Sequence, residues 1–126
     1  MSDLKHKVSA LNKTWIFDLD GTIVKHNGYK IDGIDSFLTG AKEFLENIPK
    51  EDMIIFLTSR KEEYKKQTIE FLQEYGIRYN QIIFNAPYGE RILINDRKLS
   101  GLNCSLAVNT QRDEFMKDVF EVDESL

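Results

Sequence analysis

The sequence predicts an α/β fold, in which a Rossmann-like open and mainly parallel β-sheet is flanked by helices. Three observations lead to this prediction. An apolar run at 14–17 reads as a buried strand that ends in two carboxylates. A continuous apolar run at 53–57 is typical of a central parallel strand, and 61–75 carries apolar side chains at helical spacing. Because strands that alternate with helices build parallel sheets, we expect an open α/β sheet without a cap domain.

The other expected elements continue this alternation of strands and helices along the chain. Gly and Pro mark several of the boundaries, because neither residue continues regular structure well. The remaining elements are a flap or long turn at 24–35, a helix at 36–47 stopped by Pro49, strands at 81–84, 91–94 and 105–108, and a final helix or frayed end at 114–126.

Length and composition are those of a globular protein. The chain has 126 residues, which fits a single domain over 1–126, and 41% apolar and 30% charged residues are ordinary for this class. A formal charge of −4 gives no basic surface for nucleic acid. Residues 1–7 have no apolar signal core and no stretch approaches the ~20 apolar residues of a membrane span, so we expect a cytoplasmic protein. Cys104 is the single cysteine and cannot form an internal disulfide.

Asp18 and Asp20 follow the first apolar run and precede Gly21 and Thr22. Two carboxylates crowded at the end of an apolar strand repel each other unless a cation, a proton or N–H donors compensate them. This cost suggests a functional reason for the pair. The alternative is a strand that ends in a solvated acidic turn, which is common for Asp-Gly.

Polar residues follow two further apolar runs. Thr58-Ser59-Arg60 comes after 53–57, and Asn95-Asp96 comes after 91–94. Each has an ordinary alternative, since Thr-Ser often caps a helix and Asn-Asp often forms a turn. In open α/β sheets, however, ligands bind beyond the carboxyl ends of the strands, so we expect these groups to converge with the first two carboxylates. Such a cluster of hard oxygen ligands suits Mg²⁺.

These segments resemble the motifs of the haloacid dehalogenase (HAD) superfamily of phosphohydrolases. Asp18-Leu19-Asp20-Gly21-Thr22 looks like its motif I, Thr58-Ser59-Arg60 resembles motif II, and Ile92-Leu93-Ile94-Asn95-Asp96 resembles the acidic motif IV. The resemblance extends from about residue 14 to 110. It implies a HAD-like fold and hydrolysis of a phosphate ester.

The resemblance also implies a role for each residue. Asp18 would attack phosphorus to give an aspartyl-phosphate, and Asp20 would protonate the leaving oxygen and later deprotonate water. The hydroxyl of Thr58 would contact a phosphoryl oxygen. The implied Mg²⁺ ligands are Asp18, Asp20 through its backbone carbonyl, and Asp96, and the other implied phosphate contacts are Leu19, Gly21, Thr22, Ser59, Arg60 and Asn95.

One motif departs from the family pattern. The family places a Lys or Arg, motif III, before the motif IV strand, and in small relatives it often lies in a Gly-Lys-Pro step. The matching stretch here is Asn85-Ala86-Pro87, which has no cation. Arg91 is the best substitute, because a guanidinium can hold phosphate with two hydrogen bonds. Lys98 and Arg60 are rivals, and the alternative for Arg91 is an exposed cation at a strand edge.

The spacing of the motifs leaves no room for a cap, so we expect a site open to solvent. Specificity would then come from the flap around 26–29, from a neighbouring subunit, or from a large substrate. We expect a Mg²⁺-dependent phosphatase that acts on a sugar phosphate or another small metabolite, with a role in polysaccharide-precursor biosynthesis as one option. A non-catalytic regulatory domain of the same fold, and a phosphoprotein phosphatase or phosphotransfer enzyme, are the alternatives.

Overall fold

The computed structural model describes residues 4–126, which form two compact units. Unit 2 comprises residues 12–88 and 110–115, and unit 1 comprises the described parts of 1–11 together with 89–109 and 116–126. The prediction of one domain over 1–126 stays a prediction. Within residues 4–126, no helix is both long enough and apolar enough to cross a membrane.

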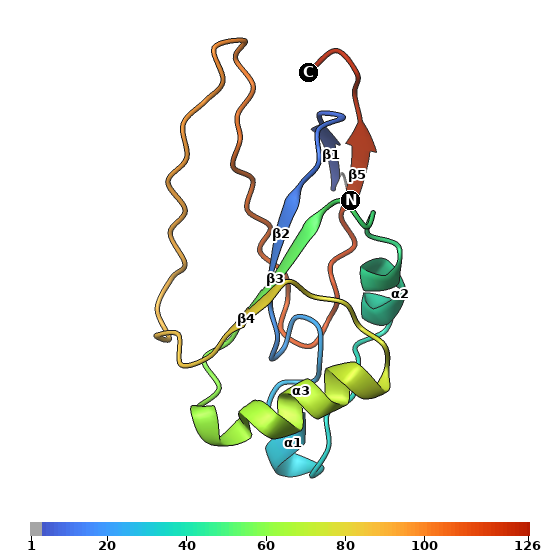
Figure 1. Ribbon diagram of the computed structural model, residues 1–126, viewed down its shortest axis with the longest axis vertical. Helices are drawn as coiled ribbons and strands as arrows, with labels where there is room; N and C mark the ends of the chain where they lie inside the picture. Colours follow the sequence, from blue (N-terminus) through green and yellow to red (C-terminus); the bar gives the residue numbers. More distant parts are fainter. Residues whose placement is uncertain (1–3) are drawn as a thin grey trace. The chain divides into compact units, whose positions relative to one another are not determined.

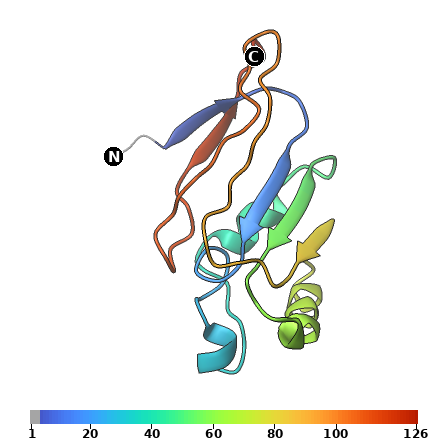
Figure 2. The ribbon, with the colours of Figure 1, turned by 90° about the vertical axis from the view of Figure 1, so that its left-hand side faces the viewer.

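Unit 2 is built on a parallel three-stranded sheet. Its strands are β2 (Thr14–Asp18), β3 (Met53–Leu57) and β4 (Gln81–Ile83), in the order β2-β3-β4. Figures 1 and 2 both show the three strands side by side, with the helical connections α2 and α3 between them in the chain. An α/β fold with parallel strands in an open sheet is therefore confirmed, and 53–57 is its central strand as predicted.

The predicted helix at 61–75 is present as a 3₁₀ turn, η1 (Glu62–Tyr64), followed by α3 (Lys65–Glu74). The helix expected at 36–47 is only partly correct, because α2 covers just Ala41–Glu46. Gly40 has a φ of +90°, a left-handed conformation that interrupts a right-handed helix before Ala41. The flap expected at 24–35 contains a single helical turn, α1 (Gly28–Ile31).

The core of unit 2 covers one face of the sheet. Along β3, Ile54 and Phe56 are buried, whereas Met53 is 44% exposed. A continuous apolar run in a central strand also predicts that both faces are covered, and this prediction is wrong at Met53, while Ile55 and Leu57 are half-buried. A continuous apolar run cannot distinguish a strand covered on both faces from one whose second face is open, since both contain the same residue types.

Unit 1 contains a two-stranded parallel sheet formed by the two ends of the described chain. Strand β1 (Lys5–Val8) pairs with β5 (Val119–Val122), in register from Lys5 and Val119 onward. The prediction of a final helix or frayed end is wrong over β5. The aromatic and β-branched residues there suit a strand, but the partner strand lies more than 100 residues away in the sequence.

Residues 89–109 of unit 1 form a long irregular excursion, drawn in orange in Figure 1. The strands predicted at 91–94 and 105–108 are absent from it, and an isolated antiparallel bridge joins Arg97 to Asn103. Residues 91–100 are all exposed. Apolar composition alone does not make a strand, because the backbone also needs a partner for its hydrogen bonds.

Candidate active site

The carboxyl ends of β2 and β3 lie side by side, as the sequence predicts. Asp18 is the last residue of β2 and pairs in register with Leu57, the last residue of β3. Thr58 follows directly, and its N–H donates to the carbonyl oxygen of Ile83 in β4 at 2.9 Å. The segments that resemble motifs I and II therefore leave the sheet at the same edge.

The turn after β2 is closed by its own hydrogen bonds. The carbonyl oxygen of Leu19 accepts N–H bonds from Thr22, Ile23 and Val24 at 3.2, 2.9 and 3.1 Å. The N–H of Gly21, at a φ of +81°, donates to the carbonyl oxygen of Val24 at 2.7 Å. Two of the N–H groups expected to cradle phosphate, those of Gly21 and Thr22, are thus engaged within the turn, and the cradle is not open at these positions.

Asp18 is half-buried at this turn. Its Oδ2 accepts a hydrogen bond from the hydroxyl of Thr22 at 3.0 Å. Thr22 thereby orients the carboxylate through its side chain. A fixed carboxylate is what an in-line attack on phosphorus needs, since much of the rate advantage of such a nucleophile comes from its positioning.

Arg60 joins the two motifs through a buried fork of hydrogen bonds. Its Nε and Nη2 donate to the two carboxylate oxygens of Asp20 at 3.1 and 3.0 Å. Nη1 and Nη2 donate to the two oxygens of Asp35 at 2.9 and 2.6 Å, and Nη1 also donates to Oγ1 of Thr68 at 2.8 Å. A guanidinium has five N–H donors, so all of them are used.

This network is removed from water. The side chains of Arg60 and Asp35 are 1% exposed and that of Asp20 is 17% exposed, while the ring of Tyr29 lies 4.0 Å from Cζ of Arg60. Burial by itself lowers the pKa of Arg60, but the hydrogen bonds and charges of Asp35 and Asp20 outweigh it and raise that pKa above its usual value. The guanidinium therefore remains charged.

The sequence predicts that Arg60 contacts phosphate, but in this structure none of its N–H donors is available for such a contact. Such a contact would require a hydrogen bond to Asp20 or Asp35 to break. The same holds for Arg60 as the missing motif III cation. We assign Arg60 instead to holding the turn after β2 against the segment after β3.

Two members of this network, Asp35 and Thr68, were not among the predicted site residues. Asp35 lies in the expected flap, 25 residues before Arg60, and no spacing rule links the two positions. Thr68 lies on the helix predicted at 61–75, at a spacing that places it with the apolar side chains. In the structure its hydroxyl donates to the carbonyl oxygen of Tyr64 at 2.7 Å. The sequence around Asp35 gives little signal for a buried carboxylate, because Asp35 lies three residues after Asp32 and is followed by Ser36.

The predicted hydroxyl ligands face the protein in this structure. Thr58 is fully buried, and its Oγ1 accepts the N–H of Arg60 at 3.1 Å. The hydroxyl of Ser59 donates to the carbonyl oxygen of Pro87 at 3.3 Å. A phosphoryl oxygen could reach Thr58 only after its surroundings open.

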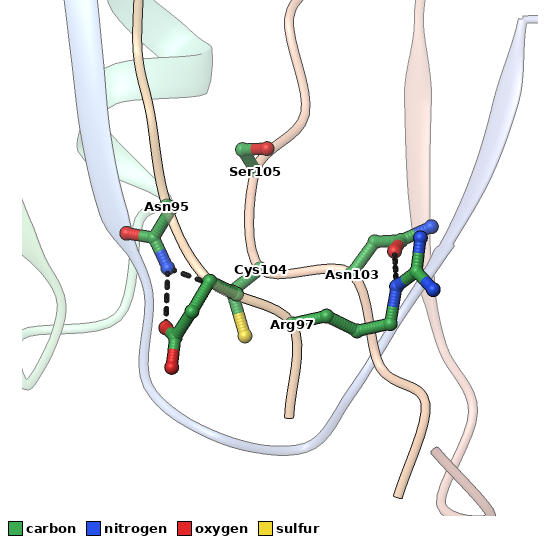
Figure 3. Close-up of a pocket in the computed structure, with 6 residues that line it drawn as sticks. Asn95, Arg97, Asn103, Cys104 and Ser105 are labelled. Atoms are coloured by element: carbon green, nitrogen blue, oxygen red, sulfur yellow. Dashed lines mark hydrogen bonds between the residues drawn. The ribbon is translucent and has the colours of Figure 1, made fainter. Parts of the chain in front are cut away.

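The remaining predicted site residues lie in unit 1, on the irregular chain of 89–109. The side-chain amide of Asn95 donates to the carboxylate and carbonyl oxygens of Asp96 at 3.3 and 3.1 Å. These two residues line an open hollow of about 460 Å³, where Nε of Arg97 donates to Oδ1 of Asn103 at 2.7 Å (Figure 3). Arg91 and Lys98 are exposed. The strand expected to carry Asp96 to the edge of the sheet is absent, so the structure gives no support for that placement.

The described residues do not assemble the predicted magnesium site within either unit. Among residues 4–126, no group of three or more His, Cys, Asp or Glu side chains is gathered in a way that could hold a metal ion. Asp96, one of the two predicted side-chain ligands, belongs to a different unit from Asp18.

Comparison with known protein families, curated proteins and solved structures finds no match to this chain. The arrangement of side chains in unit 2 is therefore the basis for a functional proposal. The likeness of its motifs to those of phosphohydrolases remains an expectation from the sequence.

Proposed function

We propose that this protein is a HAD-like phosphatase that hydrolyses a phosphate monoester through an aspartyl-phosphate on Asp18. The observation that carries the proposal is the direct connection between the two motif-like segments. Asp18 and Leu57 end neighbouring parallel strands in register, and Arg60 binds Asp20 with two hydrogen bonds. The buried arginine fixes the second carboxylate two residues after the candidate nucleophile, which the proposed chemistry requires.

The proposed reaction has two displacement steps. An oxygen of Asp18 attacks phosphorus, the ester P–O bond breaks, and the leaving oxygen takes a proton from Asp20. Water then attacks phosphorus and loses a proton to Asp20, the bond between phosphorus and Asp18 breaks, and inorganic phosphate leaves. Two easier steps thereby replace one difficult displacement.

The hydrogen bonds of Asp20 set a condition for this role. Hydrogen bonds between a guanidinium and a carboxylate are charge-assisted, so the two bonds that Asp20 accepts from Arg60 weaken while Asp20 holds the proton that it transfers. Asp20 can therefore act as the acid if its hold on Arg60 loosens during that step. During that change the two hydrogen bonds to Asp35 keep Arg60 in place.

The proposed substrate is a small phosphate ester such as a sugar phosphate, handled in the cytoplasm, with a polysaccharide precursor as one option. The motif spacing that leaves no room for a cap supports an open site, and the charge of −4 argues against a polynucleotide. We propose that the activity requires Mg²⁺, and removal of the ion by a chelator tests this requirement. A second copy of the chain is one proposed source of specificity at the open site.

One observation favours the non-catalytic alternative. The hydroxyl of Thr58 is fully buried and the N–H groups of Gly21 and Thr22 are bonded within their turn, so the phosphate contacts are closed in this structure. A domain that keeps this fold without turnover would show the same features. Among residues 4–126, no contact favours the phosphoprotein or phosphotransfer alternative.

The test is phosphate release from a generic aryl phosphate with Mg²⁺, with and without EDTA. We expect turnover that EDTA and Asp18→Asn both abolish. The matched control is Asp32→Asn, which removes the same kind of charge from an exposed residue paired with Lys25. Binding of inorganic phosphate without turnover would favour the non-catalytic domain. A screen of phosphorylated sugars and other small metabolites would then identify the ester.

A further inference from the structure

The segment 110–115 belongs to unit 2, although the chain enters and leaves it from unit 1. It is held on the turn that follows β2. The N–H of Asp113 donates to the carbonyl oxygen of Gly21 at 2.8 Å, and the carboxylate of Asp113 accepts the N–H of His26 at 2.7 Å. The ring of Phe115 also lies 5.5 Å from the ring of Phe44. These contacts fix the segment at the turn that carries Asp18 and Asp20.

Arg112 lies directly over this turn. A Cβ atom at Gly21 would be 3.1 Å from Cγ and 3.8 Å from Nε of Arg112. The stem of the arginine can approach the backbone this closely because residue 21 has no side chain. The position of the Arg112 side chain therefore depends on the absence of a side chain at Gly21.

The guanidinium of Arg112 differs from those of the other arginines in unit 2. Arg60 uses all five donors on side chains, and Arg78 donates to the carbonyl oxygens of Pro49 and Asp52. Arg112 is exposed, and within residues 4–126 no hydrogen bond or ion pair engages its guanidinium. An exposed cation whose guanidinium has no hydrogen-bond partner among the described residues thus lies beside the candidate nucleophile's turn.

A phosphate ester needs such a group. The transferring phosphoryl group carries negative charge on its oxygens, and a guanidinium can bind two of them in a fork. The sequence lacks a cation at Asn85-Ala86-Pro87, where motif III is expected, and its substitutes Arg91 and Lys98 lie in unit 1. Segment 110–115 supplies one within unit 2.

We propose that Arg112 is the cation that binds the phosphoryl oxygens at Asp18, and that the ligand it selects is a phosphate monoester dianion. The inference rests on the proposed function. Arg112 exchanges no proton in either displacement. It holds the charge on the phosphoryl oxygens as the bond to phosphorus forms on Asp18 and breaks at the ester oxygen.

The experiment compares Arg112→Gln, which keeps much of the stem over Gly21 but removes the charge, with Arg112→Lys and with Lys66→Ala. Lys66 is an exposed cation on α3, so its loss matches the change in net charge. We expect Arg112→Gln to lower kcat/KM on an aryl phosphate about 100-fold. The kcat/KM of Arg112→Lys should be about tenfold higher than that of Arg112→Gln, and that of Lys66→Ala should stay within about twofold of the wild type. Circular dichroism checks that each variant is folded.

A second readout does not depend on turnover. Titration calorimetry with inorganic phosphate should give a Kd for Arg112→Gln at least about tenfold above that of the wild type and of Lys66→Ala. If the wild type turns over but Arg112→Gln matches Lys66→Ala in both assays, Arg112 is excluded and the phosphatase stands. If phosphate binding needs Arg112 but no ester is hydrolysed, Arg112 stands and the phosphatase fails. If the wild type neither binds phosphate nor hydrolyses an ester, both proposals are overturned.

Discussion

The two units of this protein use apolar residues in opposite ways. Every buried apolar side chain in residues 4–126 belongs to unit 2, where the sheet, α2 and α3 enclose it. In unit 1 no apolar side chain of the described residues is buried, and Ile92 is 82% exposed, Ile94 is 90% exposed and Leu99 is fully exposed. The composition of the two units does not explain this difference, because both contain short Ile- and Leu-rich runs.

The difference shows that apolar side chains are buried only where a later segment of the chain packs against them. In unit 2 helices connect the parallel strands and bring apolar stripes back against the sheet. In unit 1 the two strands come from opposite ends of the described chain, and 89–109 carries no helix between them. A two-stranded sheet without such cover is only marginally stable by itself.

The largest expected effect tests the core of unit 2. Phe56→Ala should lower the free energy of unfolding by about 3–5 kcal/mol, because Phe56 is fully buried and its removal leaves a cavity. Ile16→Ala on the neighbouring strand is the control, expected to cost less than about 1 kcal/mol since Ile16 is 51% exposed. Urea unfolding measures both, and equal costs for the two variants would contradict the one-sided core.

The next effect tests the buried charge network. Asp35→Asn should cost about 3 kcal/mol of unfolding free energy, because it leaves the charge of Arg60 less compensated in a buried place. Asp32→Asn, three residues earlier, breaks an exposed pair with Lys25 and should cost at most about 0.5 kcal/mol. If thermal denaturation shows the same midpoint for both variants, the buried fork does not exist in solution.

A smaller effect concerns pH. Burial, and then the charge of Asp20, raise the pKa of Tyr29 above its usual value near 10, although Lys30 and Arg60 act in the opposite direction. A raised pKa means that the unfolded chain loses this proton first. The stabilisation from neutral Tyr29 is therefore complete below pH 10 and is lost as the pH rises through the folded pKa.

Tyr29→Phe should accordingly make the free energy of unfolding fall less steeply above pH 10. Urea unfolding at pH 8 and at several values above pH 10 measures the slope. Tyr88→Phe is the control, since Tyr88 is 81% exposed. A steeper fall for Tyr29→Phe than for the wild type would contradict the burial of this hydroxyl beside Asp20.

The smallest effect is expected in unit 1. Ile94→Ser should change the free energy of unfolding by no more than about 0.5 kcal/mol, because the side chain is 90% exposed and has little packing to lose. A cost of several kcal/mol in urea unfolding would show that residues 91–94 are buried in solution. That result would remove the contrast between the two units.

Much of unit 2 could be predicted from the sequence. The apolar runs at 14–17, 53–57 and 81–84 correspond to β2, β3 and β4, and the amphipathic stretch at 61–75 corresponds to η1 and α3. Local side-chain periodicity carries this information, because it decides which face of a strand or helix is apolar. The pairing of Asp18 with Leu57 follows from two adjacent parallel strands that end in polar residues.

Periodicity did not reveal the partners that are distant in sequence. The strand pairing of β1 with β5 joins residues more than 100 positions apart, and Asp35 meets Arg60 across 25 residues. The same is true of Arg112 at Gly21. Each of these contacts depends on where the chain returns, and the residue types at the positions are common in ordinary turns and tails.

The sequence by itself determined that two carboxylates end an apolar strand and that Thr58-Ser59-Arg60 ends the next one. Only the tertiary structure decided that Arg60 is saturated and buried while Arg112 is open to solvent, although both are arginines near the same turn. The physical reason is that hydrogen-bond donors are committed by the acceptors that folding brings within reach, and residue type alone does not specify those acceptors.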